Sequence, residues 1–195
     1  MRKLPLTAIL DEMILILLGS PRSDGNSDKL ARAFAEGAQK NAANIETIKL
    51  SQKQVKGCQD CRKCWQTGKP CVIPDHMQEI YKAIDKADLI VFSTPLYWYT
   101  WSSQIKPVWD RLLPYVSKEA PRTLAGKEAV LLAAAGDSSE EVFKGLVYSF
   151  EKSCSLLGMK IVAKLTIPGV YNPKDIEQTS ALKEAEKLGE DLTKN

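Results

Sequence analysis

Short apolar runs alternate along the chain with stretches in which apolar residues recur every third or fourth position. The apolar runs have the length of strands and cover residues 13–18, 44–50, 88–94, 128–136 and 160–167. The periodic stretches that follow them predict helices over 26–43, 75–84, 105–112, 142–157 and 182–192. Runs without polar alternation are typical of parallel strands that are buried on both faces. Five such units predict an α/β fold with helices on both faces of a five-stranded parallel sheet.

Ligands of such sheets bind beyond the carboxyl ends of the strands, near the point where the strand order reverses. The loop after Leu18 leads into a helix and carries small polar side chains at Ser20, Ser23, Asn26 and Ser27. The first turn of a helix offers unpaired N–H groups to a phosphate. Gly25 would let the backbone come close, and Arg22 would add positive charge. The alternative is that Asn26 or Ser27 only caps the helix.

The loop after Thr94 favours the phosphate hypothesis, because it is unusually aromatic. It carries four rings within five residues, at Tyr97, Trp98, Tyr99 and Trp101. A loop at the edge of a sheet has little interior for four rings, so we expect them to stack on a flat ligand. The loop after Ala135, "GDSS", would reach the polar edge of that ligand. A phosphate at one end and a planar ring at the other indicate a mononucleotide, and FMN is the natural candidate for this fold.

The stretches "GSPRSDGNS" and "STPLYWYTWSSQIKPVWDR" together resemble the NAD(P)H-dependent FMN reductases of the flavodoxin-like superfamily. The resemblance runs from about Met13 to the last helix. It implies a flavodoxin-like three-layer α/β/α sandwich, and we expect residues 1–195 to form a single FMN-binding domain. It also implies that the FMN phosphate is held by Ser20, Arg22, Asn26 and Ser27, beside Gly25. The isoalloxazine would be lined by Pro95, Leu96, Tyr97 and Trp98, with Gly136 and Asp137 near its pyrimidine side.

The same pattern contains Lys106 and Asp110, which stand four residues apart. On a helix, this spacing predicts an exposed ion pair rather than a catalytic pair. Pro107 departs from the family's pattern and is expected to disturb the first turn of that helix. We find no nucleophile–base pair and predict no catalytic side chain, since a flavin would carry the chemistry.

The segment "CQDCRKCWQTGKPC" places Cys58, Cys61, Cys64 and Cys71 in a C-x2-C-x2-C-x6-C array. Consecutive x2 spacings are typical of loops that hold an iron–sulfur cluster, whereas structural zinc more often takes two separated pairs. The array also resembles that of iron–sulfur flavoproteins, which pair FMN with a [4Fe-4S] cluster, although relatives without metal share the loop. A cluster, zinc and metal-free thiols that act as a redox sensor all remain open.

Two further residues are assigned structural roles. Cys154 falls on the apolar stripe of its helix, which predicts a core residue. His76 is the only histidine, and its place in the first turn of a helix favours a surface or packing role.

Composition excludes some classes of protein. A net charge of +3 over 195 residues, without a basic block, gives no reason to expect nucleic acid. The N-terminal stretch through Leu18 opens basic and turns apolar, but Asp11 and Glu12 interrupt it, so we expect neither a signal peptide nor a membrane span. Close-spaced cysteines that are not paired as disulfides suit a reducing, cytoplasmic compartment.

Three functions follow from these features. In the first, an FMN-dependent enzyme takes hydride from NAD(P)H and reduces a small acceptor such as a quinone, another flavin, an azo or nitro compound, or ferric iron. In the second, FMN and a [4Fe-4S] cluster carry electrons between protein partners. In the third, the chain is a thiol or zinc sensor without flavin. Exposed rings at Trp98, Tyr99 and Trp101 would suit either a homodimer interface or a nicotinamide pocket.

Overall fold

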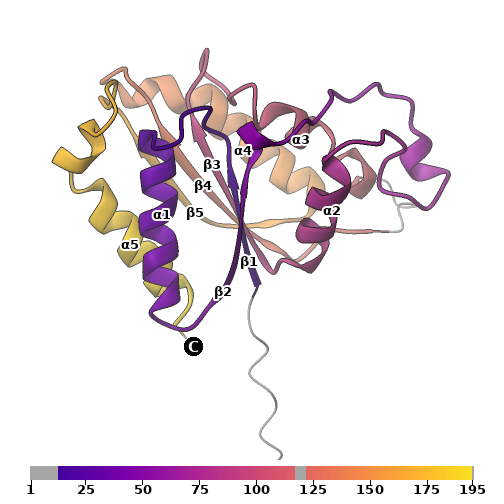
Figure 1. Cartoon of the computed structure of the whole chain (residues 1–195), viewed down its shortest axis with the longest axis horizontal. Helices are drawn as coiled ribbons and strands as arrows, with labels where there is room; N and C mark the ends of the chain where they lie inside the picture. The colour runs from indigo at the N-terminus through magenta and orange to yellow at the C-terminus, as the bar shows by residue number, and fades with distance from the viewer. Residues whose placement is uncertain (1–12, 117–121, 195) are drawn as a thin grey trace, which may run out of the picture.

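A single parallel sheet lies at the centre of the computed structural model, which describes residues 13–116 and 122–194 (Figure 1). Its five strands are ordered β2-β1-β3-β4-β5 and all pairings are parallel. The strands are β1 (Met13–Leu18), β2 (Asn44–Lys49), β3 (Leu89–Pro95), β4 (Glu128–Ala134) and β5 (Lys160–Ile167). The prediction of five parallel strands is therefore confirmed. The predictions for residues 1–12 lie outside the described residues.

Helices cover both faces of the sheet (Figure 1). One face carries α1 (Asn26–Gln39) and α5 (Ala181–Leu192), and the other carries α2 (Met77–Lys86), α3 (Lys106–Asp110) and α4 (Lys144–Leu157). Short 3-10 helices are η1 (Leu50–Gln52), η2 (Lys63–Trp65), η3 (Leu113–Tyr115), η4 (Glu140–Phe143) and η5 (Asp175–Gln178). No helix among the described residues is long and apolar enough to cross a membrane.

Each face of the sheet has its own apolar core, because successive side chains of a strand point to opposite faces. In β1, Ile14 and Ile16 pack in the core beneath α1 and α5, whereas Leu15 and Leu17 pack in the core beneath α2, α3 and α4. All four are essentially buried. Continuous apolar strands thus produce the three-layer α/β/α sandwich that the sequence predicts.

Two predicted helices end earlier than their sequence patterns. α1 ends at Gln39 rather than at Ala43, and Ala42 has a left-handed backbone with φ of 59°. α3 ends at Asp110, although Leu112 beyond it is buried as the pattern expects. An apolar period therefore marks burial correctly but overestimates how far the helical hydrogen bonds continue.

Pro107 does not disturb the first turn of α3, contrary to the prediction. It occupies the second helical position, where its missing N–H would have little role within the helix. The turn before it still closes, because the backbone N–H of Lys106 donates to the carbonyl of Ser102 over 3.0 Å. The exposed ion pair between Lys106 and Asp110 forms as predicted, at 2.6 Å.

Trp101 is not exposed, contrary to the expectation that its ring lies at the surface with those of Trp98 and Tyr99. Its side chain is buried, with its ring centroid 4.4 Å from that of Trp109 and 6.3 Å from that of Phe92. The chain turns back after Thr100 and enters the α4 side of the core, so this ring is unavailable to a partner or a ligand. The loop contributes one ring to the core and three to the edge of the sheet.

Candidate functional site

A cleft lies at the carboxyl edge of the sheet, among the loops that follow β1, β3, β4 and β5. It brings together all of the predicted FMN-contacting residues except Trp98 and Asp137. The lining residues are Ser20, Arg22, Gly25, Asn26, Ser27, Pro95, Leu96, Tyr97, Ala134, Gly136, Val170 and Tyr171. The topology explains the gathering, because β1 and β3 are neighbours in the sheet and their loops leave it side by side.

One end of the cleft is built to receive an anion. The first hydrogen bond of α1 runs from the N–H of Lys29 to the carbonyl of Gly25, which leaves the N–H groups of residues 26–28 before it. The hydroxyl of Ser27 is buried and has no hydrogen-bond partner. Ser93 fixes this turn to the sheet by donating to the carbonyl of Ser27 over 2.8 Å. A buried, unpartnered hydroxyl beside free N–H groups suits an anion such as phosphate, and these groups together form a cradle.

The loop before α1 approaches this cradle closely because position 25 has no side chain. A Cβ added at Gly25 would lie 2.8 Å from the Oγ of Ser20, which is too close for two unbonded atoms. The same Oγ accepts a hydrogen bond from the N–H of Arg22 over 3.1 Å, so it is held toward the loop's interior. Gly25 therefore lets a hydroxyl from each side of the turn face the same space.

Asn26 connects the cradle to the loop after β5. Its Nδ2 donates to the carbonyls of Val170, at 2.9 Å, and of Asn172, at 3.0 Å, while its Oδ1 is buried and unpartnered. Val170 and Tyr171 thereby become walls of the cleft, which the sequence analysis missed. The same edge-of-sheet rule that directed attention to the other loops applies to the loop after β5, so its "GVYNP" turn could have been inspected too.

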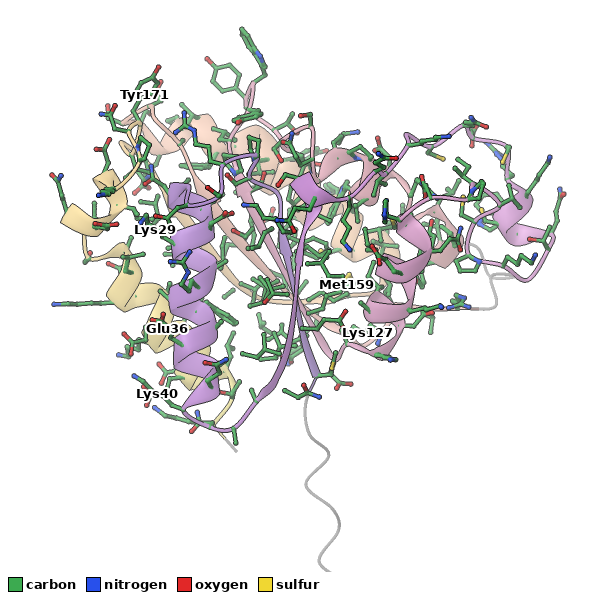
Figure 2. The ribbon with its side chains drawn as sticks, in the orientation of Figure 1. Lys29, Glu36, Lys40, Lys127, Met159 and Tyr171 are labelled. Atoms are coloured by element: carbon green, nitrogen blue, oxygen red, sulfur yellow. The ribbon has the colours of Figure 1, made fainter. Side chains whose placement is uncertain are left out.

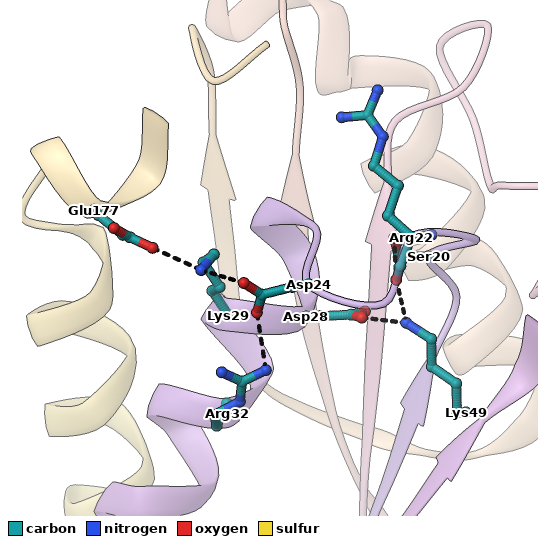
Figure 3. Close-up of polar contacts among 8 residues, drawn as sticks. All are labelled: Ser20, Arg22, Asp24, Asp28, Lys29, Arg32, Lys49 and Glu177. Atoms are coloured by element: carbon teal, nitrogen blue, oxygen red, sulfur yellow. Dashed lines mark hydrogen bonds and ion pairs between the residues drawn. The ribbon is translucent and has the colours of Figure 1, made fainter. Parts of the chain in front are cut away.

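Lys49 of β2 holds the loop after β1 against α1 through an ion pair and a hydrogen bond (Figure 3). The Nζ of Lys49 donates to the buried carboxylate of Asp28 and to the carbonyl of Arg22. Burial raises the pKa of Asp28, against the opposing effect of Lys49. The guanidinium of Arg22 points away from these contacts, as Figure 3 shows, and lines the cleft. Arg22 makes no ion pair with another described residue, so its charge is available to the cleft.

A second network lies beside the first and also fixes α1. Asp24 pairs with Lys29 at 2.7 Å and with Arg32 at 3.1 Å, and Lys29 reaches Glu177 at 2.6 Å (Figure 3). Ser23 lies outside the cleft and lines a different hollow together with Asp28 and Lys49. Of the four small polar residues that the sequence analysis names here, at Ser20, Ser23, Asn26 and Ser27, Ser23 alone does not line the cleft.

The other end of the cleft carries a tight turn with aromatic residues. Tyr97 and Thr100 exchange backbone hydrogen bonds of 3.1 and 3.0 Å, and between them Trp98 and Tyr99 have φ of 47° and 63°. Positive φ at both central residues is the geometry that normally selects Asn-Gly, so two large side chains hold it under strain. Trp98 is 91% exposed and Tyr99 61% exposed. Trp98 thus stands outside the cleft, above the wall formed by Pro95, Leu96 and Tyr97.

The loop after β4 lines the cleft with Gly136 rather than with the side chain of Asp137. A Cβ at Gly136 would lie 2.6 Å from the ring of Tyr171, so glycine allows that ring to rest on the loop. The carboxylate of Asp137 instead accepts the N–H of Ser139 over 2.8 Å, away from the cleft lining. Tyr171 is largely exposed at the carboxyl edge of the sheet (Figure 2).

The four cysteines of the array line one hollow, separate from the cleft at the carboxyl edge of the sheet. The hollow is lined by Cys58, Gln59, Cys61, Arg62, Cys64, Pro70, Cys71, Val72, Ile73, Tyr81, Arg111, Leu113 and Pro114. Cys58 and Cys61 are exposed, Cys71 is half-buried, and Cys64 is buried, which raises the pKa of its thiol, as do the neighbouring cysteines. Within residues 13–116 and 122–194, no three potential ligands converge on one point as for a single metal ion.

Asp75 and His76, directly before α2, close the cysteine loop. His76 is exposed, and its Nδ1 accepts the N–H of Gln54 over 3.0 Å. Asp75 accepts the N–H groups of Lys56, at 2.8 Å, and of Met77, at 3.1 Å. Both side chains are therefore engaged in holding the two ends of the loop together.

Cys154 stands apart from the array. It is fully buried beneath α4, and burial raises the pKa of its thiol to about 12. The prediction that it is a core residue is confirmed.

Comparison with known proteins places these features in a family. The chain is 26% identical over 167 residues to an iron–sulfur flavoprotein of Archaeoglobus fulgidus, covering 85% of this chain and 74% of that protein. It is 30% identical over 137 residues to an iron–sulfur flavoprotein of Methanocaldococcus jannaschii, covering 70% of each. The structure of the NAD(P)H:quinone oxidoreductase from Methanothermobacter marburgensis matches 94% of this chain and 96% of its own, with a TM-score of 0.70 and 21% identity, which shows a shared fold.

A sequence model of one family covers most of the chain. The family described as NADPH-dependent FMN reductase matches residues 13–168, from the start of β1 to just beyond β5. The matched segment contains the loop after β1, the aromatic turn after β3 and the cysteine array. The chain belongs to the NADPH-dependent FMN reductase family.

Proposed function

We propose that the cleft at the carboxyl edge of the sheet binds FMN and that the protein uses it to pass electrons from NAD(P)H to a small organic acceptor or ferric iron. Membership of the NADPH-dependent FMN reductase family gives the cofactor and the reductant. The observation that carries the assignment to this cleft is its two unlike ends, a phosphate cradle at Ser27 and an aromatic wall at Tyr97.

The residues of the cleft suit FMN in their chemistry. Ser20, Ser27 and the first N–H groups of α1 would hold the phosphate, and Arg22 would neutralise part of its charge. Pro95, Leu96 and Tyr97 would contact the ring system, and the backbone at Gly136 would reach its polar edge. When bound, FMN supplies hydride and electron transfer, so the protein has to orient and desolvate rather than act as an acid or a base. That division fits a lining without a histidine, glutamate or lysine.

The acceptor is proposed from the exposed side of the site. A quinone, another flavin, or an azo or nitro compound is flat and could stack on a ring that the cleft leaves open. The protein with a shared fold from Methanothermobacter marburgensis is named for quinone reduction, which supports this acceptor class. Trp98 and Tyr99 follow Tyr97 of the cleft wall and are exposed, so they would be available to contact the nicotinamide or the acceptor.

Steady-state turnover tests this function. We expect the purified protein with FMN to oxidise NADPH or NADH in the presence of a quinone, faster than free FMN at the same concentration. An anaerobic absorption spectrum of the freshly purified protein should show the flavin bands. Turnover no faster than free FMN, with both nicotinamides and with quinone, azo and ferric acceptors, would contradict the proposal.

The strained turn between Tyr97 and Thr100 allows a test in which stability and activity are expected to change differently. Replacing Tyr99 with glycine removes a left-handed backbone penalty of about 1 kcal/mol or more, while an exposed side chain loses few contacts. We therefore expect Tyr99→Gly to unfold at a higher urea concentration than the wild type. If the exposed ring guides the second substrate, the same variant should show a raised KM for NAD(P)H or for the quinone.

The matched control for this prediction is Tyr148→Gly on α4. Tyr148 is 64% exposed, like Tyr99, but lies in a regular helix, where glycine is unfavourable by about 1 kcal/mol. This control should therefore be destabilised and keep its KM values. Destabilisation of Tyr99→Gly by the same amount as Tyr148→Gly would show that the turn is not strained.

A second candidate function follows from the cysteine hollow. Four thiols that line one hollow suit a cluster with four cysteine ligands. The two relatives in Archaeoglobus fulgidus and Methanocaldococcus jannaschii are named iron–sulfur flavoproteins. In this form, the protein would carry a [4Fe-4S] cluster on Cys58, Cys61, Cys64 and Cys71 and pass electrons to protein partners. Iron and acid-labile sulfide in the anaerobically purified protein test it.

The proposal extends to the organisation of the protein. The chain would act as one FMN-binding domain over residues 1–195, in the cytoplasm, as a homodimer or larger homo-oligomer. The exposed rings Trp98 and Tyr99, without Trp101, are the surface on which a second copy would pack. Size-exclusion chromatography with light scattering measures the number of copies.

A further inference from the structure

Arg111 is the largest fully buried side chain of the described structure, with only 1% of it exposed. It follows α3 directly and lines the cysteine hollow together with Tyr81. A charged group this deep in a protein is normally paired and has its hydrogen-bonding capacity filled. The contacts of Arg111 meet the first requirement but leave the second incomplete.

One side of the guanidinium is fully engaged. Its Nη1 donates to the carboxylate of Asp75 over 2.5 Å and to the carbonyl of Lys56 over 3.2 Å. The hydroxyl of Tyr81 donates to the backbone carbonyl of Arg111 over 2.7 Å, which fixes the residue from behind. These bonds tie the end of α3 to the closure of the cysteine loop, so the position of Arg111 is set independently of any ligand.

The other side of the guanidinium has no partner. Both Nε and Nη2 are buried and make no hydrogen bond with the protein. A buried donor without an acceptor is costly, and an arginine presents these two N–H groups as a fork suited to an anion. The spare donors are therefore free to serve an anionic group.

The hollow offers sulfur as its main acceptor. Apart from the cysteines, its walls are largely apolar, with Pro70, Ile73, Leu113 and Pro114, and the hydroxyl of Tyr81 is already committed to a carbonyl. Burial opposes the charge of Arg111, but Asp75 and the nearby Cys71 outweigh it and raise the pKa of Arg111. The guanidinium thus stays charged, and Arg111 lines the hollow together with all four cysteines.

We propose that Arg111 is a positioning residue of the cysteine hollow, whose free Nε–H and Nη2–H groups donate hydrogen bonds to the anionic sulfurs of a cysteine-held iron–sulfur cluster. The proposal rests on the second candidate function, the cluster on Cys58, Cys61, Cys64 and Cys71. A cluster with four thiolate ligands gains one further negative charge when it takes up one electron. Donors to its sulfurs stabilise that reduced form and so raise the reduction potential.

The variant Arg111→Lys tests this without leaving Asp75 unpaired. A lysine ammonium keeps the positive charge and can still reach Asp75, but it has no fork to offer the sulfurs. We expect the reconstituted variant to hold iron and sulfide and to show a shift of about tenfold in the equilibrium toward the oxidised cluster. For a one-electron couple, this is a fall in midpoint potential of about 59 mV, measured by an anaerobic titration monitored by electron paramagnetic resonance.

Arg62→Lys is the matched control. Arg62 lines the same hollow, but it is exposed and already pairs with Asp60 at 3.3 Å. The same chemical substitution there should leave the potential of the cluster unchanged. The potential of the bound FMN should also be the same in the wild type and in both variants, since Arg62 and Arg111 lie outside the FMN cleft.

A second variant keeps the test decisive if Arg111→Lys does not fold, as judged by circular dichroism. Arg111→Met combined with Asp75→Asn removes both charges of the buried pair together and keeps an acceptor for the N–H of Met77. It should show a fall in potential at least as large. Loss of the cluster from either folded variant, with Arg62→Lys loaded normally, would also support the proposal.

Two results would overturn the proposal, and they are distinguishable. If Arg111→Lys and the double variant both hold the cluster at the wild-type potential, Arg111 serves only to pair with Asp75, and the cluster itself stands. If the wild type takes up no iron and sulfide on anaerobic reconstitution, the second candidate function is wrong and this inference falls with it. NADPH oxidation through FMN would be unaffected by either result.

Discussion

Replacing Ser27 with aspartate is expected to remove FMN binding while leaving the fold intact. The new carboxylate would occupy the cradle at the start of α1, where the hydroxyl of Ser27 is buried without a partner. Two like charges about 4 Å apart repel by about 4 kcal/mol at an effective dielectric of 20, which corresponds to roughly a thousandfold loss of affinity. Titration calorimetry with FMN measures the loss directly.

The fold should tolerate this change, because a carboxylate near the N-terminus of a helix is favourable by about 0.3–1 kcal/mol. Riboflavin, which lacks the phosphate, should bind the variant as it binds the wild type. This selectivity separates a blocked phosphate site from a general loss of the flavin site. Equal losses for FMN and riboflavin would place the phosphate elsewhere or show a disturbed cleft.

Ser23→Asp is the matched control for the same loop. Ser23 is exposed and lines the hollow on the other side of the loop, beside Lys49 rather than beside the cradle. We expect Ser23→Asp to change the affinity for FMN by less than threefold, because a solvent-exposed charge outside the cradle is largely screened. A large effect of Ser23→Asp would mean that the phosphate lies on that side of the loop.

The sequence was most informative where one physical rule acts alone. Continuous apolar runs predicted every strand of the sheet, because strands buried on both faces need no polar alternation. The edge-of-sheet rule then selected the loops after Leu18 and Thr94, whose residues line one cleft. Residue type added the chemistry, since small hydroxyls, glycine and the start of a helix together favour phosphate.

The sequence was less informative where the path of the chain decides which way a side chain points. Trp101 and Trp98 are the same residue type in the same loop, yet one is buried and the other is 91% exposed. The turn between Tyr97 and Thr100 makes that difference, and two large residues with positive φ gave no sequence signal for a turn of this kind.

The sequence pattern also does not reveal contacts between residues that are far apart in the chain. Nothing local indicates that the amide of Asn26 would reach the carbonyl of Val170, or that Arg111 would meet Asp75. Both contacts join segments far apart in the chain, and both complete a site. The sequence does offer one signal. Arg111 stands beside the apolar stripe of its helix, and because arginine is almost never buried without a partner, a buried ion pair can be expected there.

The packing of α1 against α5 carries the second large prediction. The two helices touch backbone to backbone at Gly37 and Gly189: a Cβ at Gly189 would lie 2.0 Å from the carbonyl oxygen of Phe34, and one at Gly37 would lie 1.8 Å from that of Glu186. Neither neighbour is a flexible side chain. Only separation of the helices along this contact makes room for a methyl group.

Gly189→Ala is therefore expected to destabilise the protein by about 3 kcal/mol or more, at or above the usual range for overpacking a core. The sign is opposite to that of an exposed helix position, where alanine in place of glycine stabilises by about 1 kcal/mol. The midpoint of urea unfolding of the FMN-free protein measures the change. Lys187→Ala, two residues away on the exposed side of α5, should shift stability by less than about 0.5 kcal/mol.

The double variant tests whether one helix contact accounts for both effects. Once the first methyl group has moved α5 away from α1, the second methyl group meets a gap that is already open. Gly37→Ala combined with Gly189→Ala should therefore cost clearly less than the sum of the two single variants, because neighbouring sites that share one displacement are not additive. Additive costs would mean that each alanine is accommodated by its own local shift. A single variant as stable as the wild type would show that the helices are not held together at these glycines.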